Sequence, residues 1–113
     1  MKTLHTVASI LIIALGLLHC AFTFRNYDGL SFDAAWFLGT GMAIVLAGFM
    51  NIALLRDGGQ DIVVWSMALL TNVVFLLGFV VASYMMRQPQ VFVGAGLFTV
   101  TAIYSFIVKP IKL

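Results

Sequence analysis

The chain has 113 residues, of which 63% are hydrophobic and only 9% charged, and its mean hydropathy is +1.12. Its six basic and four acidic side chains stand in short gaps between long apolar runs. This composition excludes a soluble enzyme, a nucleic-acid-binding protein with a basic face and a disordered chain, and it predicts a protein whose main partner is the lipid bilayer.

Four apolar segments follow one another along the chain. A helix that crosses a hydrocarbon core about 30 Å thick needs roughly 20 mostly apolar residues. Residues 4–24, 34–55, 62–86 and 91–108 meet or nearly meet that length. They are continuously apolar rather than alternating, so strands are excluded. We therefore predict an all-α integral membrane protein with a single transmembrane domain over residues 1–113.

The three gaps between these segments carry helix-ending residues. In the first gap, Ser31 or Asp33 can cap the following helix. In the second, a Gly-Gly pair ends one helix and Asp61 can cap the next. In the third, Pro89 hinders continuation of the preceding helix. Connections this short bring each helix back beside its predecessor, which predicts an up-down-up-down four-helix bundle.

The charges in the gaps predict an orientation. With four spans, both termini lie on the same side of the membrane. That side carries four basic residues, Lys2, Arg56, Lys109 and Lys112, and the other side carries two, Arg25 and Arg87. The positive-inside rule then predicts a multi-pass protein of the plasma (bacterial inner) membrane with cytoplasmic termini. Because the difference is small, insertion in both orientations stays open. The first segment is too long for a signal peptide and lacks a small-x-small cleavage pattern, so we expect it to remain as a helix.

Each segment also carries a stripe of small or polar residues at helical spacing, which should face the bundle interior. In the first two segments the stripes are His5, Ser9, Ile12, Gly16, His19 and Thr23, and Trp36, Thr40, Ala43, Ala47 and Asn51. In the last two they are Trp65, Ala68, Asn72, Phe79 and Ser83, and Gly94, Thr101, Ser105 and Val108. We expect a homo-oligomer, with Gly41 and Gly48 as its contact if the bundle does not bury them.

The depth of the polar residues suggests a track through the bundle. A rise of about 1.5 Å per residue places them in three layers, with His5 in the headgroup region, where its imidazole is expected to be hydrated. The predicted ligand-binding residues, from the outer layer inward, are His19, Thr40, Ser83, Asn72, Thr101 and Asn51. Two interpretations are open: a path or site for a small neutral or lipid-like molecule, or hydrogen bonds that hold the helices together.

His19 is the interior residue that packing explains least, because an imidazole in a span is uncommon and can bind a ligand or relay a proton. A neutral imidazole bonded to a neighbouring hydroxyl is the simpler explanation. Cys20 points about 100° away from it and is expected to be a packing residue. An enzyme acting on a lipid would use His19 with Cys20 or Ser83, but we expect no catalytic residue, no metal site and no cofactor.

One haem hypothesis remains as an alternative. His5 and His19 are fourteen residues apart, which returns to nearly the same helix face about 21 Å away. This spacing is similar to that of the histidines that hold stacked haems in membrane cytochromes of the b type. A dimer of first helices would be required, because one helix supplies only half of the ligands.

Two families of known function are similar to this chain. Its length and four spans resemble the small multidrug transporters in architecture, which implies an antiparallel dimer that exchanges cations on a glutamate of the first helix; this sequence contains no glutamate. Gly39 and Thr40 at the start of the second segment, followed by Asn51, are similar to the dimeric fluoride channels. The arginine and glycine pattern of the first helix of those channels is missing here.

A third resemblance covers the first half of the chain. The motifs Gly-Leu-Leu-His at 16–19, Trp-Phe-Leu-Gly-Thr-Gly at 36–41 and Gly-Phe-Met-Asn at 48–51 resemble uncharacterised small four-span bacterial membrane proteins. This resemblance implies the topology and no reaction. The sequence therefore favours binding or translocation of a small neutral or lipid-like ligand, with a structural or assembly subunit of a membrane complex as the alternative. A hollow beside His19 and Asn72 would distinguish the two.

Overall fold

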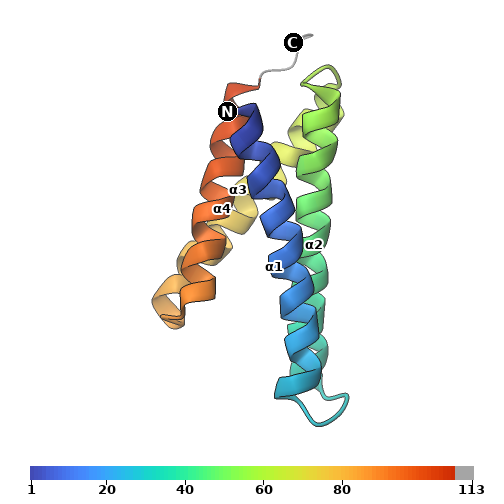
Figure 1. The fold of residues 1–113 in the computed structure, drawn as a ribbon, viewed down its shortest axis with the longest axis vertical. Helices are drawn as coiled ribbons and strands as arrows, with labels where there is room; N and C mark the ends of the chain where they lie inside the picture. The colour runs from blue at the N-terminus through green and yellow to red at the C-terminus, as the bar shows by residue number, and fades with distance from the viewer. Residues whose placement is uncertain (109–113) are drawn as a thin grey trace.

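The structure, a computed structural model, describes residues 1–108 and contains four α-helices and no strand in that range. The helices are α1 (Lys2–Asn26), α2 (Phe32–Asp57), α3 (Ile62–Met85) and α4 (Pro89–Ile107) (Figure 1). The predicted all-α four-helix bundle is confirmed. Lys109 and Lys112, which contributed to the predicted orientation, lie outside the described residues.

The helix ends follow the sequence signals. Ser31, rather than Asp33, caps α2, because its hydroxyl accepts a hydrogen bond from the Ala34 amide at 3.1 Å. The Asp61 carboxylate caps α3, and Gly58 ends α2 at a φ of 67°, a left-handed conformation that glycine adopts without strain. Pro89 is the first residue of α4, where its missing N–H has no helical partner to lose.

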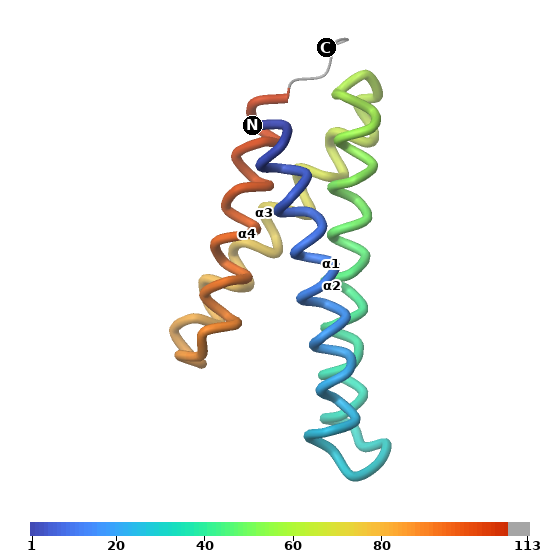
Figure 2. Tube along the Cα trace, viewed as in Figure 1, coloured from blue at the N-terminus to red at the C-terminus, as the bar shows by residue number. Residues whose placement is uncertain are grey.

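The helices form two antiparallel pairs, α1 with α2 and α3 with α4, and the pairs contact each other through α1–α4 and α2–α3. Figures 1 and 2 show that the pairs converge at the end where the N-terminus and the end of α4 lie, and diverge toward the α1–α2 and α3–α4 loops. The bundle is therefore splayed at one end, and this shape determines which polar residues can meet.

Glycines bring α1 and α2 into backbone contact. A Cβ on Gly16 would lie 2.8 Å from the carbonyl oxygen of Gly41, and one on Gly41 would lie 2.9 Å from the Cys20 backbone nitrogen. A Cβ on Gly48 would lie 3.2 Å from the Ile13 backbone nitrogen and closer still to its side chain. Gly41 and Gly48 are thus buried inside the bundle. The condition under which these two glycines were expected to form a homo-oligomer contact is therefore not met, because α1 already occupies that face.

An apolar cluster joins the two pairs near the middle of the bundle. It consists of Ile12, Ile44, Ala47 and Phe98, with Phe75 and Phe79 packed against it. The predicted interior stripes agree with the buried residues of α1, α3 and α4 in large part.

The stripe predicted for α2 is wrong in its first half. Trp36, Thr40 and Ala43 are exposed, and Trp36 keeps 66% of its surface accessible, whereas Ile44 is buried. The reason is the divergence of the helix pairs. At this level the face of α2 that would meet α3 opens into a cleft.

Candidate functional site: a cleft beside His19

Polar residues gather at the converged end of the bundle. Six side chains from all four helices are fully buried there, and we call them the asparagine cluster: His5, Ser9, Asn51, Asn72, Thr101 and Ser105. At its centre the amides of Asn51 and Asn72 donate to each other's side-chain oxygens at 2.8 Å. Asn72 also donates to the Ser105 hydroxyl at 2.7 Å, and that hydroxyl donates to the backbone carbonyl of Thr101 at 2.8 Å. These hydrogen bonds connect α2, α3 and α4. The side chains of the asparagine cluster have no surface accessible to solvent.

His5 belongs to the same cluster. Its Nε2 lies 3.0 Å from the carbonyl oxygen of Asn51, which can only accept, so Nε2 is the protonated nitrogen. The ring stacks on Tyr104 with centroids 3.9 Å apart, and Nδ1 is buried without a partner. The expectation of a hydrated His5 is wrong, because α2 and α4 cover the ring.

This arrangement gives the haem hypothesis no support. An axial ligand needs a free nitrogen and room for a macrocycle beside it. The Nε2 of His5 is held by a backbone carbonyl, its Nδ1 is buried with no space beside it, and Tyr104 covers a face of its ring.

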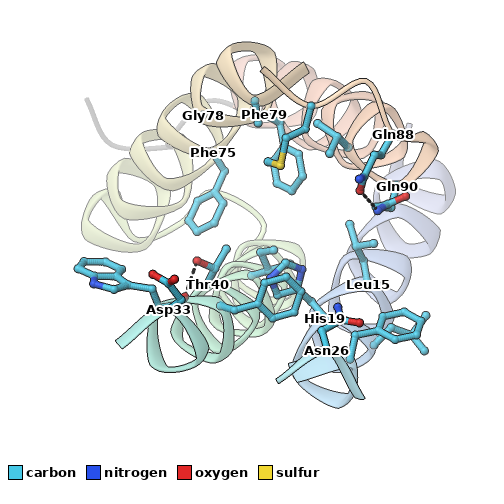
Figure 3. A pocket seen from close by; sticks show the side chains of 18 of the residues that line it. Leu15, His19, Asn26, Asp33, Thr40, Phe75, Gly78, Phe79, Gln88 and Gln90 are labelled. Carbon is cyan, nitrogen blue, oxygen red and sulfur yellow. Dashed lines mark hydrogen bonds between the residues drawn. The ribbon is translucent and has the colours of Figure 1, made fainter. Parts of the chain in front are cut away.

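A cleft of about 1060 Å³ lies at the other end, where the helix pairs diverge. Figure 3 shows it enclosed by all four helices, with Phe75 and Phe79 of α3 across from His19 and Thr40. We call it the His19 cleft, and its walls include Leu15, His19, Trp36, Thr40, Phe75 and Phe79. Polar side chains also line it near the loops, namely Asn26, Tyr27, Asp33, Gln88 and Gln90. The cleft therefore has largely apolar walls with polar groups toward the loops.

His19 contributes the deepest nitrogen-bearing side chain of the cleft. Its ring stacks on Phe37 with centroids 3.8 Å apart and planes 15° from parallel, which fixes the orientation of the imidazole. Its Nε2 is buried and has no hydrogen-bond partner. The Thr40 hydroxyl donates to the Trp36 carbonyl at 2.9 Å, so only its oxygen lone pairs remain available. Because Nε2 has almost no accessible surface, it does not face the cleft, although other atoms of the His19 side chain line it.

The structure separates the six predicted ligand-binding residues into groups. His19 and Thr40 line the cleft, whereas Asn51, Asn72 and Thr101 are fully buried in the asparagine cluster. Ser83 donates to the Phe79 carbonyl at 2.7 Å and lies in a separate hollow beside Arg87.

The two main groups do not form a continuous track. Along α1, Ile12 lies between His19 and the residues of the cluster, and along α2, Ile44 lies between Thr40 and Asn51. Both isoleucines belong to the apolar cluster at mid-bundle. The polar layers predicted from depth are therefore interrupted by a packed apolar layer.

Sequence reasoning missed the aromatic side chains that shape the cleft. Phe37 and Phe75 were not among the predicted site residues, yet they face His19 from α2 and α3. A signal exists in the helical spacing, because Trp36 and Thr40 are one turn apart and Phe37 follows directly. Spacing alone does not show that these residues line a cleft, because the cleft exists only where the two helix pairs diverge.

The structure shows no pairing of His19 with a nucleophile in the described range. The Cys20 thiol packs toward α2, 3.8 Å from the Leu38 carbonyl, and the Ser83 hydroxyl bonds to its own helix. Within residues 1–108, no three His, Cys, Asp or Glu side chains are placed to hold a metal ion.

Comparison of the chain with protein-family profiles, with curated proteins and with solved structures finds no match in any of the three. All four described helices are long and apolar enough to cross a membrane by length and composition.

Proposed function

We propose that this chain is a multi-pass membrane protein that binds a small, uncharged, lipid-like molecule in the His19 cleft. The observation that carries the proposal is a cleft of about 1060 Å³ with largely apolar walls, among which the imidazole of His19 is one of a few polar groups.

The size and lining of the cleft support a ligand rather than a packing gap. Sites for drug-sized molecules have volumes of about 300–1,000 Å³, mostly apolar walls and a few polar groups that orient the ligand. The His19 cleft has a volume at the upper end of that range, and its walls are likewise mostly apolar with a few polar groups. Hydrocarbon tails of bilayer lipids could fill the volume, but they offer nothing to the imidazole.

The closed asparagine cluster favours binding over passage. Its side chains are fully buried, and Asn51, Asn72 and Ser105 are bonded to one another, so this conformation has an opening at the diverging end and a seal at the converged end. Translocation would require the cluster to separate. A site entered from one end is the simpler function for this geometry.

We further propose that the protein lies in the plasma membrane with cytoplasmic termini. The sequence assigns four basic residues to the side of the N-terminus, Lys2, Arg56, Lys109 and Lys112, and two to the other side, Arg25 and Arg87. The positive-inside rule then favours the side of the N-terminus as the cytoplasmic one. The His19 cleft would then open in the outer half of the bilayer, where lipid-like molecules partition.

A substitution at His19 tests the proposed function. His19→Leu fills a similar volume without a polar atom, so the protein should stay folded and lose the lipophilic molecule that copurifies with it in mild detergent. Mass spectrometry of the extracted material measures the loss, and circular dichroism reports the fold. Thr99→Val is the matched control, because Thr99 is exposed on α4 and bonds only to its own helix.

Two results would contradict the proposal. The same molecules, in the same amounts, could copurify with both variants and the parent. Alternatively, His19→Leu could leave the molecule bound and change only the thermal stability. In that case His19 would be a packing residue.

The structural alternative has its own supporting observation. Two of the predicted ligand-binding residues, Asn51 and Asn72, are explained by side-chain bonds between helices, as expected of a bundle that only scaffolds or assembles with a second copy. Gly39 and Gly96 have open space beside them and are available for such a contact. A complex mass above that of the monomer in mild detergent, reduced by Gly96→Leu, would support this role.

A further inference from the structure

We infer that Phe79, held against Gly94, determines how broad a ligand the His19 cleft accepts, and that the cleft takes an uncharged molecule wider than a single hydrocarbon chain. This selectivity rests on the proposed function and adds the residues that limit the size of the ligand. Phe79 lines the cleft, whereas Gly94 does not and acts through Phe79 as a positioning residue.

The Phe79 ring lies in a recess on the surface of α4. Gly94 is buried, and a Cβ built on it would lie within 2.6 Å of three ring atoms of Phe79. Real Cβ atoms do not approach other atoms this closely, so the ring can keep its place only beside a glycine. Because the ring is set back into this recess, it projects less far into the cleft than it would beside any larger residue.

Phe98 holds the Phe79 ring on a second side. It lies one turn after Gly94 on α4 and is fully buried, and its ring stacks on Phe79 with centroids 5.5 Å apart and planes 27° from parallel. Phe98 also stacks on Phe75 at 5.0 Å and belongs to the apolar cluster at mid-bundle. A ring packed in this way gives little room to a neighbour. The cleft is therefore the side to which the Phe79 ring can move.

A displaced Phe79 ring would narrow the cleft where it faces α1 and α2. Figure 3 shows Phe79 across the open space from His19 and Thr40. Next to it on α3, Gly78 also lines the cleft, and a Cβ on Gly78 would meet nothing within 4 Å. The space beside this wall is thus empty, so a side chain at position 94 that touches no ligand still changes the width of the cleft.

The dimensions of the cleft favour a broad ligand. Its lining extends along α1 from Leu15 to Asn26, eleven residues that correspond to about 16 Å of helix. A volume of about 1060 Å³ over that length gives a mean cross-section on the order of 60 Å². Because carbon atoms in contact lie about 4 Å apart, one extended hydrocarbon chain needs only about 20 Å². A single chain would therefore leave most of the cleft empty.

Two alcohols with the same number of carbons test the width. Both 1-dodecanol, a thin chain, and cyclododecanol, a broad ring, carry one hydroxyl group and no charge. They are titrated into the detergent-solubilised full chain carrying Trp65→Phe, in which Trp36 of the cleft lining is the only tryptophan. We expect this parent to bind both alcohols, with a saturable change in the emission of Trp36.

Gly94→Ala should weaken the binding of cyclododecanol at least about tenfold and that of 1-dodecanol less than about threefold, because the new methyl group moves the Phe79 ring into the cleft. Gly96→Ala is the matched control. It lies two residues later on the same helix, meets nothing within 4 Å and should leave both affinities unchanged. Equal weakening of the two alcohols by Gly94→Ala, or the same affinities as in Gly96→Ala, would refute the inference.

Substitutions of Phe79 provide a second test that does not depend on the folding of Gly94→Ala. Phe79→Leu shortens this wall, so it should favour cyclododecanol over 1-dodecanol a few-fold more than the parent does. The double variant Gly94→Ala/Phe79→Leu should recover cyclododecanol binding, since the smaller side chain leaves room for the methyl group. An unchanged ratio of the two affinities in Phe79→Leu would show that this ring does not limit the width.

The parent itself separates this inference from the proposed function. If it binds 1-dodecanol saturably but excludes cyclododecanol, the broad cleft is refuted while a lipid-like ligand is retained. If it binds neither alcohol saturably, the proposed function and the inference both fail.

Discussion

Asn72 is the residue on which the converged end depends most. Its side chain exchanges hydrogen bonds with Asn51 of α2 and donates to Ser105 of α4. An amide can satisfy two helices at once because it carries a donor and an acceptor on one short side chain. The cost of the arrangement is that removal of either amide leaves the side-chain oxygen of the other buried without a donor.

Asn72→Leu should therefore lower the free energy of unfolding by about 1–3 kcal/mol, because the Asn51 amide loses its side-chain partner. The double variant Asn51→Leu/Asn72→Leu should recover part of the loss, since no asparagine is then left unpaired. Unfolding in mixed detergent micelles, followed by circular dichroism, measures both. Additive effects of the two substitutions would show that the pair is not coupled.

At the scale of helices, the two pairs are built differently. The α1–α2 pair depends on glycines that allow backbone contact, and here the small residues were correctly predicted to face protein. In the α3–α4 pair, Gly94 accommodates the Phe79 ring, and Trp65 bonds to the Ser105 carbonyl. Gly94 thus helps to place a wall of the cleft, a function that small size alone does not reveal.

Gly41→Ala should destabilise the protein by about 1–3 kcal/mol, because the new methyl group would overlap the backbone of α1. Gly39→Ala, two residues earlier on the same helix, meets open space and should be neutral or stabilising by up to about 1 kcal/mol. Thermal unfolding of the two variants measures both changes in stability. Equal effects would mean that α1 and α2 are not in backbone contact.

For the whole molecule, the splay of the two pairs explains why polar residues from similar stripes have different surroundings. The same helices converge on the asparagine cluster and diverge around His19. Packing between them is completed by the apolar cluster of Ile12, Ile44 and Phe98. A bundle closed along its full length would bury Trp36 and leave no cleft.

The orientation in the membrane is testable by labelling. With Cys20 replaced by alanine, single cysteines are introduced at Lys2, Gln60, Asp28 and Gln88. A membrane-impermeant maleimide should label positions 28 and 88 on intact cells and positions 2 and 60 only after permeabilisation, as cytoplasmic termini require. The reverse pattern would refute the orientation. Equal labelling of all four from outside would indicate insertion in both directions.

The helices, their ends and their order could be predicted from local features of the chain. The four apolar runs are long enough to cross a bilayer, and Ser31, Gly58 and Asp61 mark boundaries through local hydrogen bonds and backbone conformation. Most residues that face the bundle interior could also be predicted, because their spacing along a helix determines which of them lie on the same side. These properties depend on contacts within a few residues along the chain.

The separation of the polar residues depends on contacts between helices. Spacing and depth placed His19, Thr40 and Asn72 on interior faces, but they carried no information on how closely the pairs approach at each level. The glycines of α1 and α2, the Asn51–Asn72 bonds and the Phe98 packing together set that approach. They close the bundle around Asn72 and leave it open at His19, so a seal and a cleft arise from stripes that look alike in the sequence.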